Sequence, residues 1–141
     1  MKNYRKLAII TIGTSLFLLA AVSATSAAVV NKAGSFYKVK IETSGDGDNR
    51  TAVITVTGTN GYHCNKLYPW KLTLIPGEGI TLKKVKFKKG DATKFAQKAV
   101  VFTVPYIAVA QAKTVTAKLK LSLCDDKQCQ MESVNLSWPA R

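Results

Sequence analysis

From residue 35 onward, apolar and polar residues alternate along most of the chain with a period of two. Runs of this kind, bounded by turn residues, are typical of half-buried antiparallel strands. Clusters such as SGDGDN (44–49) and PGEG (76–79) are rich in the turn formers Gly, Asn and Asp and separate the runs. The predicted strands are Ser35–Thr43, Arg50–Thr59, Trp70–Pro76, Ile80–Lys89, Ala99–Ala108, Lys113–Leu123 and Gln130–Trp138.

A helical period is weak throughout the region that follows residue 28. The best candidate is Asp91–Ala99, for which we expect one helical turn or a loop. About seven short strands within about 110 residues, without internal repeats, are typical of an immunoglobulin-like antiparallel β-sandwich. The sequence therefore predicts one all-β domain at 28–141.

The N-terminal segment has the layout of a secretory signal peptide. Lys2, Arg5 and Lys6 precede the apolar run Leu7–Val22, and small residues follow that run. We expect a signal peptide at 1–27, cleaved after Ala24 or Ala27, and a periplasmic or secreted protein. A retained membrane anchor is the alternative, although no stop-transfer flank follows the run.

The chain is strongly basic, with a formal net charge of +13. Removal of 1–27 leaves 18 basic and 8 acidic residues, a net charge of +10. The stretch Leu82–Lys98 holds seven lysines. They predict either an anion-binding patch or, as we favour, a solvated strand face whose lysines protect a sheet edge. We expect no nucleic-acid partner, because the protein is exported and no stacking aromatic residues accompany the lysines.

Three cysteines, Cys64, Cys124 and Cys129, accompany the export signal. An oxidising compartment favours a disulfide, and the odd count leaves one thiol over. The four residues between Cys124 and Cys129 fit a hairpin loop, which would place the two cysteines across from each other at the short edge of the separation that a disulfide accepts.

The stabilisation that such a bridge provides distinguishes only weakly between a structural disulfide and a redox-active one. In the chain-entropy model, closing a loop of about 6 residues contributes about 2 kcal/mol, against about 4 kcal/mol for a loop of about 60 residues such as Cys64 to Cys124. A local bridge therefore stabilises the fold only slightly, and this modestly favours a role in thiol–disulfide exchange. Asp125 and Asp126 would raise a nearby thiol pKa and Lys127 would lower it, so the residues alone leave structural and redox roles equally open.

Two stretches resemble the N-terminal domain of the DsbD family of thiol–disulfide interchange proteins. LSLCDDKQCQMESVNLSW (121–138) is similar to that family's cysteine hairpin, and NGYHCNKLYPWKLTL (60–74) is similar to its Gly-Tyr-His-apolar-Asn segment. The resemblance implies a periplasmic immunoglobulin-like domain in which Cys124 and Cys129 are the catalytic pair. Gln130 and Met131 depart from the family, in which proline often follows the second cysteine.

The resemblance also implies partners and shielding residues. Its partners would be periplasmic thioredoxin-like proteins or membrane thiol–disulfide reductases, which would supply the electrons that a stand-alone module lacks. Tyr62, Tyr68 and Tyr106 are candidates for shielding the disulfide. The sequence leaves the oligomeric state open, and the alternative function is a non-catalytic binding or scaffold sandwich with a structural disulfide.

The remaining candidate chemistry is limited. We expect Cys64 to be a small buried hydrophobe. A soft-metal site built from His63, Cys64, Cys124, Cys129 and Met131 is the less favoured alternative, because adjacent strand residues point to opposite faces. We therefore expect no metal and no cofactor. A single histidine also leaves little scope for general acid–base catalysis.

Overall fold

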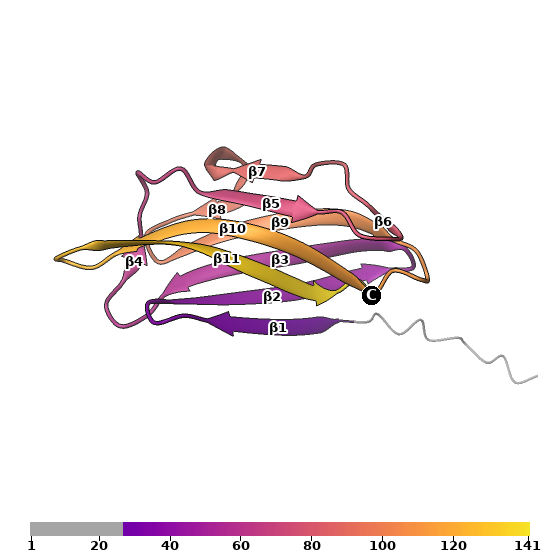
Figure 1. The fold of residues 1–141 in the computed structure, drawn as a ribbon, viewed down its shortest axis with the longest axis horizontal. Coiled ribbons are helices and arrows are strands. Elements are labelled where there is room, and N and C mark those ends of the chain that lie inside the picture. The colour runs from indigo at the N-terminus through magenta and orange to yellow at the C-terminus, as the bar shows by residue number, and fades with distance from the viewer. Residues whose placement is uncertain (1–26) are drawn as a thin grey trace, which may run out of the picture.

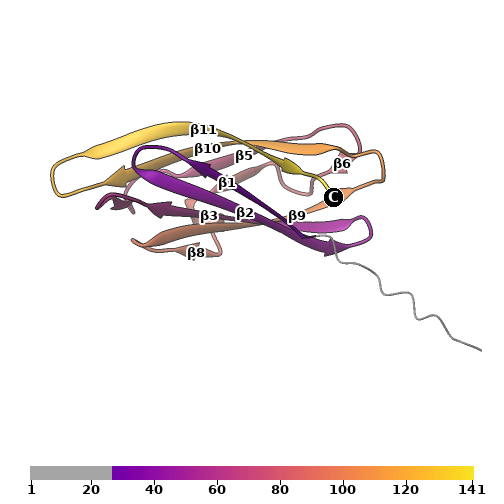
Figure 2. The ribbon, with the colours of Figure 1, turned by 90° about the horizontal axis from the view of Figure 1, so that it is seen from below.

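The structure, a computed structural model, describes residues 27–141, and the expected signal peptide at 1–27 lies almost wholly outside the described residues. Two antiparallel sheets pack face to face, with β10, β11 and β5 in one layer and β3, β9 and β8 in the other (Figure 2). Seven of the described strands have five or more residues. The predicted all-β, immunoglobulin-like sandwich is therefore confirmed.

The first sheet has six strands in the order β1-β2-β3-β9-β6, and β8 also pairs with β9. Its strands are β1 (Ala28–Ala33), β2 (Tyr37–Asp46), β3 (Asn49–Gly58), β6 (Ile80–Thr81), β8 (Lys94–Phe95) and β9 (Ala99–Ala108). Alternate residues of β2, β3 and β9 are buried, as the period of two predicts.

The second sheet has five strands in the order β11-β10-β5-β7, and β4 also pairs with β10. Its strands are β4 (His63–Cys64), β5 (Lys71–Ile75), β7 (Lys86–Lys88), β10 (Thr114–Cys124) and β11 (Cys129–Pro139). β4 and β5 meet the same edge of β10, β4 beside Leu123–Cys124 and β5 beside Thr116–Lys120. This arrangement brings the 63–64 segment next to the first cysteine of the hairpin.

Two local predictions are corrected, and one strand is added to the predicted set. The segment Ile80–Lys89, expected as one strand, is split between β6 and β7, which belong to different sheets. Asp91–Ala99 contains the end of a 3-10 turn (Lys89–Asp91) and the strand β8. β1 was not predicted; it is an edge strand with two half-buried residues, so its apolar period is faint. In the described residues no helix is long and apolar enough to span a membrane.

The core between the sheets is continuous and apolar. Its largest fully buried side chains are Trp70, Trp138, Tyr37 and Phe102. Burying side chains of this size is the main favourable contribution to folding, at about 25 cal/mol for each Å² of apolar surface removed from water. The core therefore holds the two sheets together without help from the cysteine hairpin, which lies at one end of the sandwich (Figure 1).

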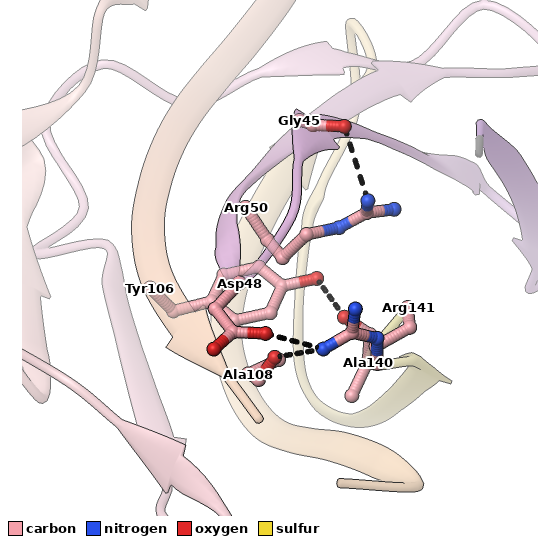
Figure 3. Close-up of polar contacts among 7 residues, drawn as sticks. All are labelled: Gly45, Asp48, Arg50, Tyr106, Ala108, Ala140 and Arg141. Atoms are coloured by element: carbon pink, nitrogen blue, oxygen red, sulfur yellow. Dashed lines mark hydrogen bonds and ion pairs between the residues drawn. The ribbon is translucent and has the colours of Figure 1, made fainter. Parts of the chain in front are cut away.

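The opposite end of the sandwich holds the C-terminus and the start of β1 (Figure 1). Figure 3 shows how polar contacts fasten it: the Tyr106 hydroxyl donates to the Ala140 carbonyl at 3.2 Å, and the Arg141 guanidinium donates to Asp48 Oδ1 at 2.6 Å and to the Ala108 carbonyl at 2.7 Å. The buried Arg50 also donates to the Gly45 carbonyl, at 3.1 Å. Tyr106 therefore fixes the C-terminus and lies far from the cysteine hairpin, so it is not a shield for the disulfide.

Candidate functional site

Cys124 and Cys129 form a disulfide at the tip of the β10–β11 hairpin. They are the last of eleven directly opposed residue pairs in this ladder, and their Cα atoms are 3.9 Å apart. The hairpin geometry predicted from the four-residue spacing is confirmed. Cys129 is an exposed residue and Cys124 is half-buried, so the bridge can be approached from the Cys129 side of the hairpin.

The turn between the cysteines is ordered by its own hydrogen bonds. The Asp125 carboxylate accepts from the backbone N–H groups of Lys127 at 2.8 Å and Gln128 at 2.7 Å, and the Asp125 N–H donates to the Gln128 carbonyl at 2.9 Å. The backbone N–H groups of Lys127 and Gln128 lower the pKa of Asp125. A lowered carboxyl pKa stabilises the turn above the unfolded-state value near 3.9, and this contribution is lost only as the pH falls through the folded-state value.

His63 lies directly across β10 from the disulfide. Cys124 is opposed to Cys129 on one side and to His63 on the other. Directly opposed residues of antiparallel strands project from the same face, with Cβ atoms about 5 Å apart. The imidazole of His63 and both sulfur atoms therefore share one face of the five-stranded sheet, which the sequence alone did not reveal.

Asn65 and Tyr62 complete the surroundings of the hairpin. Asn65 Nδ2 lies 3.9 Å from Cys129 Sγ and 3.4 Å from the Ser122 hydroxyl. The Tyr62 hydroxyl accepts from Gln128 Nε2 at 3.1 Å, and its ring packs against Phe36 with centroids 5.4 Å apart. Of the three candidate shielding tyrosines, Tyr62 is thus the one that contacts the cysteine turn.

Cys64 lies on the other face of the sheet. It is opposed to Leu123, which is fully buried, and is itself only 1% exposed. Its thiol is 3.9 Å from the Val56 carbonyl, and burial raises its pKa to about 11. Cys64 is thus a buried apolar residue, and its thiol points away from the disulfide.

This separation bears on the soft-metal hypothesis. Cys64 faces the core, whereas His63 and the two bridged sulfur atoms lie on the outer face. Within residues 27–141, no three His, Cys, Asp or Glu side chains gather in a way that could hold a metal ion. The five residues considered from the sequence are therefore not brought together as one ligand set.

The fold is similar to those of two solved GAE domains. The GAE domain of yeast GGA1 superimposes with a TM-score of 0.51 and 13% identity, over 81% of this chain and 99% of that one. The GAE domain of GGA2p from Saccharomyces cerevisiae gives a TM-score of 0.49 and 15% identity, over 82% of this chain and all of that one. At these identities the likeness shows the fold alone. No protein-family profile and no curated protein sequence matches the chain.

These comparisons correct the resemblance to the DsbD family. The structural neighbours are appendage-ear sandwiches of a different family, and no sequence match supports DsbD. The quoted stretches reflect local constraints: a strand–Cys–turn–Cys–strand pattern suits any hairpin closed by a cross-strand disulfide, and the Asn60-Gly61 pair forms a turn with positive φ at both residues. Such local patterns do not identify a family.

The burial of Cys64 leads to a direct prediction. In the native protein with its disulfide intact, we expect the Cys64 thiol to resist a thiol reagent such as 5,5′-dithiobis(2-nitrobenzoate) at neutral pH, because it is covered by the core and protonated. After unfolding in guanidinium chloride the same thiol reacts at once. Release of the chromophore, followed over time, measures both; rapid labelling of the folded protein would contradict the buried position.

Proposed function

We propose that the protein is an exported thiol–disulfide exchange domain that passes reducing equivalents to or from partner proteins through Cys124 and Cys129. One observation carries the proposal: the disulfide joins directly opposed residues at the tip of a hairpin, with Cys129 exposed. Exchange proceeds by in-line attack of a thiolate on one sulfur atom, so it requires this kind of access.

The bridge adds little to the cohesion of the hairpin. Eleven opposed pairs already join β10 to β11, and the Asp125 carboxylate orders the turn. In the chain-entropy model, closing a loop of about 6 residues adds only about 2 kcal/mol. A disulfide that is accessible and mechanically almost redundant is suited to opening and closing while the fold stays intact.

The exposures assign different roles to the two cysteines. A thiolate of the partner attacks Cys129 Sγ and forms a mixed disulfide, and the electron pair of the broken bond leaves on Cys124 Sγ. The Cys124 thiolate accepts a proton from water. A second thiol of the partner then attacks the partner's own sulfur and releases Cys129. The partner's dithiol is thereby oxidised to a disulfide and the domain is reduced; the reverse sequence reduces an exported disulfide.

The proposed location and partners follow from the sequence of the leader. The basic start, apolar run and small residues of 1–27 are typical of a signal peptide, and the resulting compartment is oxidising. In such a compartment a reducing domain draws its electrons from another protein. Periplasmic thioredoxin-like proteins or a membrane thiol–disulfide reductase are partners with suitable chemistry.

The reduction potential of the Cys124–Cys129 pair tests this function. In a Cys64→Ala variant of residues 28–141, we expect a potential above about −300 mV, the level below which disulfides behave as structural bridges. Equilibration in glutathione or dithiothreitol buffers, read by alkylation and mass, gives the value. A potential below that level, with the fold unchanged on reduction, would instead support a non-catalytic binding sandwich in which the bridge is a brace.

The position of His63 gives a second, kinetic prediction. Because His63 is opposed to Cys124 on the same face of the sheet, we expect His63→Ala to slow reduction of the disulfide by dithiothreitol about two- to ten-fold, the loss of one hydrogen bond in the transition state. His63→Gln keeps a hydrogen-bond donor and should recover part of the rate. Lys98→Gln, a nearby exposed change, is the matched control. Equal rates for all four proteins would exclude a role for His63.

A further inference from the structure

The pairing of β7, β5 and β10 assembles five lysines on the outer face of the five-stranded sheet. Lys88, Lys71 and Lys120 are opposed in one line across three strands, and Lys86, Thr73 and Lys118 form the next line. Neighbouring strands lie about 4.8 Å apart, so the first line places the backbones of three lysines within roughly two strand spacings. We call Lys71, Lys86, Lys88, Lys118 and Lys120 the lysine face.

Protection of a sheet edge does not account for this face. β7 is an edge strand, so Lys86 and Lys88 fit that role, but Lys71, Lys118 and Lys120 lie on β5 and β10, which have partners on both sides. Like charges directly opposed on adjacent strands are destabilising. Uncharged polar residues would keep this surface soluble without that repulsion. The opposed lysines therefore favour an anionic partner.

The protein itself supplies little negative charge to this face. The outward-pointing positions of β5, β7, β10 and β11, all of which are described, carry Lys, Thr, Ser, Asn and apolar residues but no carboxylate. The acid next to β7 is Asp91, whose carboxylate accepts from Lys84 Nζ and from the Lys88 backbone N–H. The lysine face is therefore left for a partner from outside.

An apolar hollow borders the lysine face. The loop between β4 and β5 and the end of β7 line a depression of about 510 Å³, whose lining includes Leu67, Tyr68, Trp70, Lys71 and Lys88. The loop is held in shape, because the buried Trp70 donates its indole N–H to the Asn65 carbonyl at 2.8 Å. Leu67 is 93% exposed at its rim. Such a hollow fits one apolar side chain flanked by acidic residues.

The lysine face and the disulfide lie on the same face of the same sheet. Lys120 and Cys124 are four residues apart on β10, about 13 Å along the strand. We propose that the lysine face and the adjoining hollow dock an acidic surface of the protein that exchanges thiols with Cys124 and Cys129. This inference rests on the proposed function and names the chemistry of the partner.

A protein fits this face better than an anionic membrane does. The hairpin tip next to the disulfide carries Asp125 and the exposed Asp126, which a uniformly negative bilayer laid along the face would also meet. A partner protein with a localised acidic patch can contact the lysines with that patch while its thiol reaches the disulfide at the hairpin tip. The hollow, moreover, suits a single side chain rather than a lipid surface.

The test uses synthetic cysteine peptides as probes. One peptide carries a cysteine, a leucine and otherwise glutamate; its twin has glutamine in place of every glutamate. At about 0.01 M salt, we expect the acidic peptide to reduce the disulfide at least about ten-fold faster than its twin. The advantage disappears at about 1 M salt, where the Debye length falls to about 3 Å. It also disappears in a Lys71→Gln/Lys118→Gln/Lys120→Gln variant.

A matched variant and two further measurements separate the outcomes. Lys38→Gln/Lys94→Gln/Lys113→Gln removes the same charge elsewhere, and in this variant the acidic peptide should still react faster than its twin. If both variants lose this rate difference equally, the effect is due to net charge and the docking face is overturned. If the two peptides reduce the disulfide at equal rates, the docking face is overturned, whereas the proposed exchange function is not. If neither peptide reduces the disulfide, exchange fails, and fluorescence anisotropy with a cysteine-free acidic peptide still tests the face. Binding to phosphatidylglycerol vesicles through the same lysines, without binding of that peptide, would overturn the protein partner.

Discussion

The antiparallel register of β10 is the constraint on which the proposed chemistry depends. At its end, Cys124 is opposed to Cys129 on β11 and to His63 on β4; further along, Lys120 is opposed to Lys71 on β5. One strand thus places the bridge, the imidazole and the centre of the lysine face on a single surface. A slip of β10 by one residue would turn Cys124 and Lys120 toward the core and away from these partners.

The same alternation that builds the core places the three cysteines in different environments. Leu123 and Cys64 are opposed and point inward, so the thiol of Cys64 is buried and its pKa is raised to about 11. Cys124, the next residue, points outward and is bridged. The buried Cys64 therefore does not compete for the bridge while the domain is folded, and the proposed exchange would involve Cys124 and Cys129 alone.

Much of the fold was predictable, because strands with one buried face carry their period in the sequence. Ala99–Ala108 matches β9 at both ends. The split of Ile80–Lys89 had a signal as well: the alternation that includes Ile80 and Leu82 changes phase before Val85 and Phe87, where the chain crosses between sheets. β1 escaped prediction because an exposed edge strand shows little apolar period.

The site was predictable only as far as it is local in sequence. Cys124 and Cys129 are five residues apart, so hairpin geometry sufficed to pair them. The opposition of His63 to Cys124 and of Lys71 to Lys120 depends on strand pairing between distant segments, which a single sequence does not encode as a pattern. The likeness to the DsbD family is wrong for a related reason, because a cysteine hairpin and an Asn-Gly turn are local features that unrelated proteins share.

Mapping the first mixed disulfide shows whether Cys129 is the sulfur that a partner thiol attacks. The oxidised Cys64→Ala domain is mixed with glutathione, quenched in acid and alkylated with N-ethylmaleimide, and its peptides are analysed by mass. Because Cys129 is the more exposed residue and Cys124 is opposed to His63, we expect glutathione on Cys129 and maleimide on Cys124. Glutathione on Cys124, or a folded domain that forms no mixed disulfide at all, would contradict this expectation.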